Sequence, residues 1–221
     1  MTAPRALFFD TFGTVVEWRT CVTKALTTAA QQALESGRDF PADVRGHQHH
    51  YSALQDLLSQ QGILELFTDS ELRSLTFAWH RLDPWADSVP GLNLLNKRFI
   101  TSTLSNGNVT LLEDLQRHGS LPFTHITSAE NFGAYKPSPL VYNGAAKLLG
   151  LEASQCAMVA AHLSDLQAAK SCGFQTIYVE RHFEEAWSAD EVEQAKKDGF
   201  VDHWVDLNIG GLSRGGSAAR G

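Results

Sequence analysis

The sequence of 221 residues has no long apolar run and no cluster of basic residues. Its first apolar segment ends at Asp10, which is too short for a secretory signal, and no apolar span of about 18 residues follows. Lys and Arg number 18 against 25 Asp and Glu, a net charge of −7, and they are scattered singly. These absences argue against a membrane protein and against a nucleic-acid-binding protein, and predict a soluble, cytoplasmic protein that acts on small molecules.

Cysteine is scarce, and glycine-rich nucleotide-binding motifs are missing. The three cysteines, Cys21, Cys156 and Cys172, are an odd number without metal-ligand spacing, so we expect reduced structural thiols. No Gly-x-Gly-x-x-Gly or P-loop pattern occurs. The His-x-His-His stretch at 47–50 lacks a nearby carboxylate or cysteine that would complete a metal site. The sequence therefore implies neither a metal nor an organic cofactor.

Six short segments have the character of buried strands, and helical patterns separate the later ones. The expected strands are 6–9, 99–104, 125–127, 157–160, 176–179 and 203–205. The expected helices between them are 111–118, 139–149 and 165–172. Apolar strands rich in β-branched and aromatic residues are typical of parallel sheets covered on both faces. The pattern predicts an α/β fold with a Rossmann-like, doubly wound and mostly parallel sheet.

The interval 20–96 interrupts this alternation, because it shows only helical periodicity. Thr68 and Glu71 form a capping-box signature at the start of one of these helices. We therefore expect an all-helical cap inserted after the first strand, and a glycine-rich tail that is disordered and without function. The expected division is a core of 1–19 and 97–209, a cap of 20–96 and a tail of 210–221.

Polar residues follow the expected strands, where ligands bind in an open α/β sheet. Asp10 precedes a glycine turn, so it could be a nucleophile beside backbone N–H groups that hold an anion, or simply structural. Ser105 and Asn106 follow the second strand, in a segment that also suits a helix N-cap. Lys136, before a proline, could direct its ammonium to Asp10 or stay in solvent. Asp165 suits a helix N-cap after a later strand.

Four motifs, in order, resemble those of the haloacid dehalogenase superfamily: Asp10, Ser105-Asn106, Lys136-Pro137 and Asp165. Phosphatases of this superfamily carry Asp-x-Asp in the first motif and Gly-Asp-x-x-x-Asp in the last. Here Phe12 and Ala161 replace two of those carboxylates. Magnesium needs oxygen ligands and a phosphoryl leaving group needs an acid, so phosphatase activity is not expected.

The pattern is instead similar to the type II L-2-haloacid dehalogenases, whose first motif commonly reads Asp-x-Tyr-Gly-Thr and whose insertion is a helical cap. Arg45 resembles the cap arginine of that family. The resemblance implies that Asp10 attacks C2 of a short (S)-2-haloacid and expels halide. Water then hydrolyses the aspartyl ester to the (R)-2-hydroxy acid, without a metal or cofactor. A homodimer is the common state of such soluble enzymes.

The resemblance also implies roles for individual residues. Lys136 would keep Asp10 ionised. The residues expected to contact substrate or halide are Thr11, Phe12, Thr14, Arg45, Ser105, Asn106 and Tyr142. Within this set the first two backbone amides and the serine would bind the substrate carboxylate, whereas Arg45 and Asn106 would stabilise the halide. Thr14 would also support the Asp10 loop.

His162 stands where the family often has asparagine, and this departure carries a separate hypothesis. Its imidazole could be the base that activates the hydrolytic water, with Glu17 or Asp165 orienting the ring. A structural or substrate-shaping histidine is the alternative.

Two other functions stay open at this point. The same aspartyl chemistry could act on another small carbon electrophile or on a phosphate ester, and magnesium dependence would distinguish the latter. A catalytically silent anion-binding protein is the other possibility. Asp10 and Lys136 argue against it, because an anion binder gains nothing from a carboxylate in its pocket.

Overall fold

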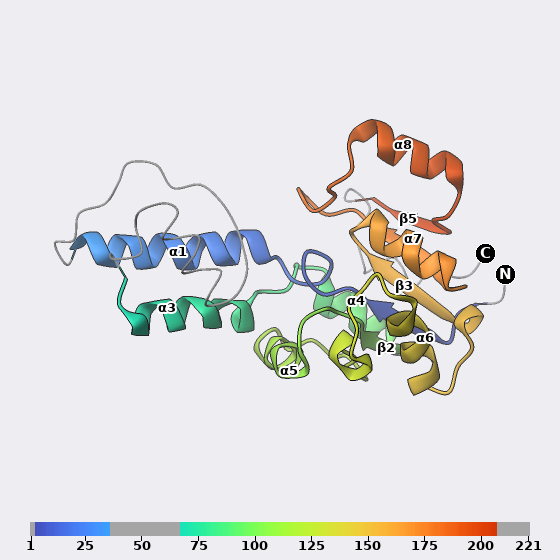
Figure 1. The fold of residues 1–221 in the computed structure, drawn as a ribbon, viewed down its shortest axis with the longest axis horizontal. Coiled ribbons are helices and arrows are strands. Elements are labelled where there is room, and N and C mark those ends of the chain that lie inside the picture. The colour runs from blue at the N-terminus through green and yellow to red at the C-terminus, as the bar shows by residue number, and fades with distance from the viewer. Residues whose placement is uncertain (1–2, 36–66, 207–221) are drawn as a thin grey trace. The chain divides into compact units, whose positions relative to one another are not determined.

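The computed structural model describes residues 3–35 and 67–206, drawn as coloured ribbon in Figure 1. The chain divides into two compact units, Met1–Glu17 with Asp83–Gly221 and Trp18–Leu82. We call them the sheet unit and the helical unit. The sheet unit includes residues 83–96, which the sequence analysis had placed in the cap.

Three sequence predictions lie outside the described residues. They concern Arg45, the His-x-His-His stretch at 47–50 and the tail at 210–221.

A five-stranded parallel sheet forms the centre of the sheet unit, with the strand order β2-β1-β3-β4-β5. The strands are β1 (Ala6–Phe9), β2 (Ile100–Thr103), β3 (Cys156–Ala160), β4 (Gln175–Val179) and β5 (His203–Val205). Phe8 of β1 pairs with Ser102 on one side and with Met158 on the other. The order reverses direction between β1 and β3, and the carboxyl ends of strands at such a switch point border a crevice. The predicted α/β fold is confirmed.

Helices cover both faces of this sheet. They are α4 (Ser88–Leu95), α5 (Val109–His118), α6 (Pro139–Leu148), α7 (Leu163–Ser171) and α8 (Ala189–Asp198), with short 3-10 helices η3 (Ala129–Phe132) and η4 (Ala153–Gln155). Phe8 and Met158 point into a buried cluster that contains residues of α6, α7 and α8. Phe9, on the opposite face of β1, packs edge-on against Phe123 at 5.6 Å between ring centroids, and α4 contacts β2.

The strand expected at 125–127 is not formed, although the other five are. An isolated bridge joins His125 to Ser102 of β2, and another joins Ser128, just after the segment, to Ser105. Threonine side chains take the place of the backbone ladder there. The Thr103 hydroxyl donates to the carbonyl of Thr127 at 2.9 Å and accepts from its N–H at 2.9 Å. The polar side chains of β2 therefore hold this segment through hydrogen bonds. A search for apolar patterns in the sequence does not detect such bonds.

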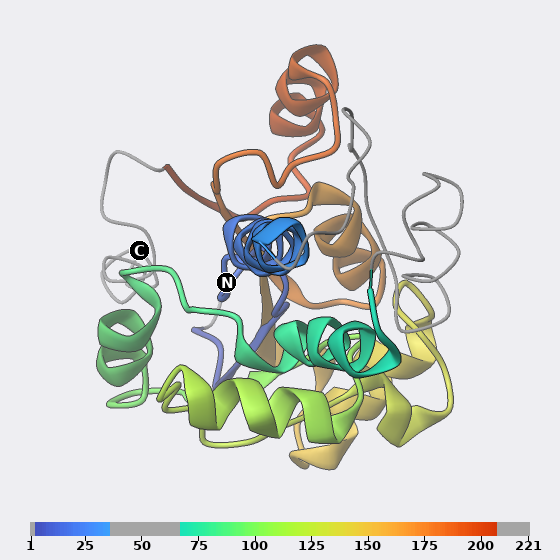
Figure 2. The same ribbon diagram turned by 90° about the vertical axis from the view of Figure 1, so that its left-hand side faces the viewer.

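All described elements of the helical unit are helices, α1 (Trp18–Glu35), α3 (Asp69–Thr76) and the 3-10 helix η2 (Phe77–Arg81). Figures 1 and 2 show α1 in blue and α3 in teal side by side. Leu26 of α1 packs against the buried cluster of Phe67, Leu72 and Leu75. Trp18 stacks on Trp79 with ring centroids 5.6 Å apart. Thr68 begins α3 with the predicted capping box, so that prediction is confirmed.

None of the helices in the described part of the chain is long and apolar enough to span a bilayer.

Candidate active site

Asp10 lies at the carboxyl end of β1, beside the end of β3, where its N–H donates to the carbonyl of Val159 at 3.0 Å. A tight turn follows, in which the N–H groups of Val15 and Val16 both donate to the carbonyl of Thr11. Gly13 has a φ of +77°, a left-handed conformation that favours glycine. The turn holds Asp10, a residue that is only 8% exposed, at the switch point of the sheet.

Thr14 connects this turn to the end of β3. Its buried hydroxyl donates to Oδ2 of Asp10 at 2.9 Å and accepts from the N–H of Ala161 at 3.0 Å. Both of its hydrogen-bonding directions are therefore used inside the protein. This geometry matches the expected support of the Asp10 loop. The side chain is fully buried, and its assignment as a substrate-contacting residue stays a prediction.

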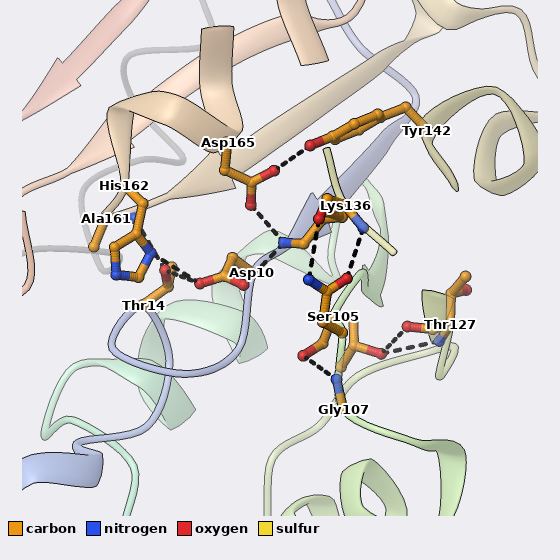
Figure 3. A network of polar contacts seen from close by, with 12 residues as sticks. Asp10, Thr14, Ser105, Gly107, Thr127, Lys136, Tyr142, Ala161, His162 and Asp165 are labelled. Carbon is orange, nitrogen blue, oxygen red and sulfur yellow. Dashed lines mark hydrogen bonds and ion pairs between the residues drawn. The ribbon is translucent and has the colours of Figure 1, made fainter. Parts of the chain in front are cut away.

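Lys136 brings a buried ammonium between two carboxylates (Figure 3). Its Nζ lies 2.9 Å from Oδ1 of Asp10 and 2.5 Å from Oδ2 of Asp165. Burial alone would lower the pKa of Lys136, but the two carboxylates outweigh it and raise that pKa above its usual value. Burial would raise the pKa of Asp10, but Lys136 and His162 hold it well below its usual range. Asp10 is thus ionised although it is buried.

Asp165 binds the ammonium of Lys136, and Tyr142 binds Asp165 in turn. Asp165 is in the first turn of α7, and the N-cap of that helix is His162, so the expected N-cap at Asp165 is wrong. The fully buried Tyr142 donates its hydroxyl to Oδ1 of Asp165 at 2.6 Å. Tyr142 therefore holds the carboxylate that binds Lys136, and its assignment to substrate contact stays a prediction.

The segment after β2 fixes Lys136 from another side. Asn106 accepts from the N–H of Lys136 at 2.7 Å and donates to its carbonyl at 3.3 Å. The amide expected to face the halide thus clamps the lysine backbone in this structure. Ser105 is buried and accepts from the N–H of Gly107 at 3.2 Å. Asn108 is the N-cap of α5, so the capping role in this segment belongs to a residue other than Ser105 or Asn106.

Of the other residues expected to contact substrate, Thr11 is buried and Phe12 half-buried. A side chain added at Gly107 would lie 3.1 Å from the Phe12 ring, so this ring lies beside the segment that carries Ser105.

His162 lies between two carboxylates. Its Nδ1 is 3.3 Å from Oδ2 of Asp10, and its Nε2 is 3.7 Å from Oε2 of Glu184. Burial would lower the pKa of His162, but the carboxylates of Asp10 and Glu184 outweigh burial and raise that pKa to about 10. The imidazole is therefore protonated at neutral pH in this arrangement.

Glu184 is a site residue that the sequence analysis missed. It comes from the loop after β4 and is only 4% exposed. Its carboxylate fills the space beside Gly13, where an added Cβ would lie 2.1 Å from Oε2. The expected ring partners were Glu17 and Asp165. The carboxylate of Asp165 binds Lys136 and Tyr142 instead, and the role of Glu17 stays a prediction.

Arg181, from the same loop, is a second residue that the sequence analysis missed. It is buried and donates Nε–H to the carbonyl of Thr14 at 3.1 Å and Nη1–H to Asp87 at 2.8 Å. The polar stretch 180–185 directly follows the expected strand 176–179, so the rule that located the other site residues could have found both Arg181 and Glu184.

The parallel sheet and the buried aspartate–lysine pair at its switch point define an α/β enzyme with an ionised carboxylate in its site. Residues 4–173 match the family model for haloacid dehalogenase-like hydrolases. The chain therefore belongs to the haloacid dehalogenase-like hydrolase family, and the resemblance found in its motifs is confirmed.

Several known dehalogenases are similar to this chain over most of its length. (S)-2-haloacid dehalogenase 1 of Pseudomonas sp. (strain CBS-3) is 30% identical over 198 residues, which cover 80% of this chain and 85% of that protein. Haloacetate dehalogenase H-2 of Moraxella sp. (strain B) is 25% identical over 208 residues, covering 86% and 90%. The crystal structure of a defluorinating L-2-haloacid dehalogenase has a TM-score of 0.78 and 28% identity, covering 99% of this chain and 96% of that one.

Proposed function

We propose that this protein is a hydrolase that removes the halogen from short (S)-2-haloacids and forms (R)-2-hydroxy acids through an ester on Asp10, without a metal. The observation that carries the proposal is the Asp10 carboxylate, buried yet held ionised 2.9 Å from Lys136. A desolvated but ionised carboxylate is the form that attacks carbon. The (S)-2-haloacid dehalogenase at 30% identity supports this class of substrate.

In the first half-reaction Asp10 attacks C2 from the side opposite the halogen, and halide leaves with the electron pair of the broken bond. Inversion at C2 follows from this direction of attack. Thr14 and Lys136 each bind one oxygen of the carboxylate, which fixes its plane and direction before substrate arrives. Asp165 and Tyr142 stabilise Lys136 in that position.

In the second half-reaction water attacks the carbonyl carbon of the ester. His162 is the proposed base, because its Nδ1 lies 3.3 Å from the carboxylate oxygen Oδ2 of Asp10. Glu184, at the other ring nitrogen, is the proposed orienting group in place of Glu17 or Asp165.

The substrate carboxylate would be bound by Ser105 and the backbone N–H groups of Thr11 and Phe12. All three residues belong to the segments that follow β1 and β2, next to Asp10. Arg45 would stabilise the halide, and the helical unit would act as a cap that excludes water. These assignments follow from the family resemblance.

Halide release from L-2-chloropropionate in EDTA-containing buffer tests the proposal, with wild type compared with Asp10→Asn. We expect release that survives chelation in the wild type and is lost in the variant, and a wild-type ester on Asp10 that mass spectrometry detects after rapid quenching. Wild-type protein that releases no halide from short 2-chloro- or 2-bromoacids would contradict the proposed function.

A further inference from the structure

The contacts of His162 differ from those of a histidine that is a base from the outset. One ring nitrogen faces Oδ2 of Asp10 at 3.3 Å, and the other faces Oε2 of Glu184 at 3.7 Å. With a carboxylate at each nitrogen, both nitrogens are donors and the ring carries a proton on each. Such a ring has no lone pair with which to accept a proton from water.

Ester formation changes one of these two contacts. The Asp10 carboxylate loses its negative charge when one of its oxygens bonds to carbon, whereas Glu184 keeps its charge. The nearer of the two anions that stabilise the protonated ring is thereby removed.

We infer that each catalytic cycle releases its proton in the first half-reaction, when the ester forms on Asp10, and that the neutral imidazole left on His162 is the base of the second. This inference rests on the proposed function. Formation of the ester is then the step that turns His162 into a base.

The balance of atoms and electrons is as follows. In the first half-reaction the C2–halogen bond breaks, a bond forms between C2 and an Asp10 oxygen, and the protonated His162 gives one proton to solvent. In the second, water loses one proton to His162 while its oxygen bonds to the ester carbonyl carbon. The bond from that carbon to the oxygen on C2 then breaks, and the other water proton ends on the hydroxy acid. Asp10 is again ionised, His162 again protonated, and one halide and one proton have been released.

The charged groups around the His162 ring favour release of the proton before water attacks the ester. The charged groups that act on His162 are Asp10 after β1, Glu184 after β4 and Lys136 before α6. Burial and the Lys136 ammonium both lower the pKa of His162, and the two carboxylates raise it. When the Asp10 charge is lost, Glu184, at 3.7 Å, is the one carboxylate among the described residues beside the ring that still opposes the two influences that lower this pKa. The pKa of His162 must then fall.

An NMR titration of the whole protein with ¹⁵N-labelled histidine tests this step without turnover. Asp10→Asn removes the negative charge, as ester formation does, and keeps the shape of the Asp10 side chain. We expect the pKa of His162 to fall from about 10 to near 7, because loss of an opposite charge at this distance can lower a pKa by up to about 3 units. His162→Gln assigns the signal among the nine histidines.

Glu193→Gln is the matched control, because it removes one negative charge from an exposed residue of α8 that pairs with Lys196. We expect it to leave the His162 titration unchanged. A pKa in Asp10→Asn that stays above about 8, where the ring keeps its proton near neutral pH, overturns the inference.

Rapid mixing of excess enzyme with L-2-chloropropionate in weak buffer near neutral pH follows the proton directly. A pH indicator reports the proton, a halide probe the chloride, and chemical quenching the 2-hydroxypropionate. We expect the proton to appear with chloride and ahead of the hydroxy acid. A proton that appears only with the hydroxy acid overturns the inference and leaves the proposed function intact. If neither product forms, the proposed function fails, and the NMR titration alone decides the charge coupling.

Discussion

Replacing Thr14 by valine should destabilise the sheet unit and weaken its active site, although the two side chains have nearly the same shape. The Thr14 hydroxyl makes two buried hydrogen bonds, one to Asp10 and one from Ala161. Valine can make neither. The variant therefore leaves a buried N–H without a partner and removes one of the bonds that fix the nucleophile.

The magnitude follows from these two bonds. A buried hydrogen bond to a charged group contributes about 1.5–3 kcal/mol, and an unsatisfied buried N–H costs about 1–3 kcal/mol. We expect Thr14→Val to lower the free energy of unfolding by about 2.5–6 kcal/mol. Thr14→Ser is the control, because it keeps both bonds and loses one methyl group, at about 1 kcal/mol.

Urea unfolding followed by circular dichroism measures the stability of both variants, and halide release measures their activity. The valine variant should unfold at a lower urea concentration than the serine variant and release halide more slowly at saturating substrate. Equal urea midpoints for the two variants would show that the hydroxyl stabilises nothing, and the reasoning from its two contacts would be refuted.

Two further predictions concern the charges and the space around Asp10. Lys136→Met leaves Asp10 and Asp165 buried without their shared cation, so we expect the pKa of Asp10 to rise. Halide release should fall by about a hundredfold or more. The control is Lys147→Met, which removes a lysine from an exposed position. Unchanged halide release in Lys136→Met would contradict this prediction. Gly13→Ala introduces left-handed strain and a Cβ that overlaps Glu184, whereas Gly150→Ala introduces similar strain in open space. Only the first should lose activity, and equal activity of the two variants would refute the contact.

The sequence predicted the fold well because parallel strands buried on both faces have a simple signature. Five of the six expected strands are present, and the expected segment 203–205 coincides with β5. The rule that ligands bind beyond strand ends also located Asp10 and His162, which the structure brings together. Lys136 was recognised from its motif, and its ammonium reaches Asp10 as expected.

The rest of the site could not be predicted, because it depends on contacts between segments far apart in the sequence. Glu184 reaches the His162 ring from an irregular loop, and no periodicity fixes where such a side chain ends. The hydroxyl of Tyr142 and the amide of Asn106 could equally have faced substrate. Only the structure shows that they bind Asp165 and the Lys136 backbone instead.

The site is best understood as a row of alternating charges, Asp165, Lys136, Asp10, His162 and Glu184. Buried charges are tolerated when each has an opposite neighbour, and removing one leaves its partner uncompensated. Esterification of Asp10 neutralises the central member of the row and leaves two cations beside it. Lys136 still has Asp165, at 2.5 Å, whereas the carboxylate left beside His162 among the described residues is the more distant Glu184, at 3.7 Å. The imidazole is also the weaker base of the two, so the proton must leave from His162 and not from Lys136. The order of charges in the fold thus determines which group becomes the base.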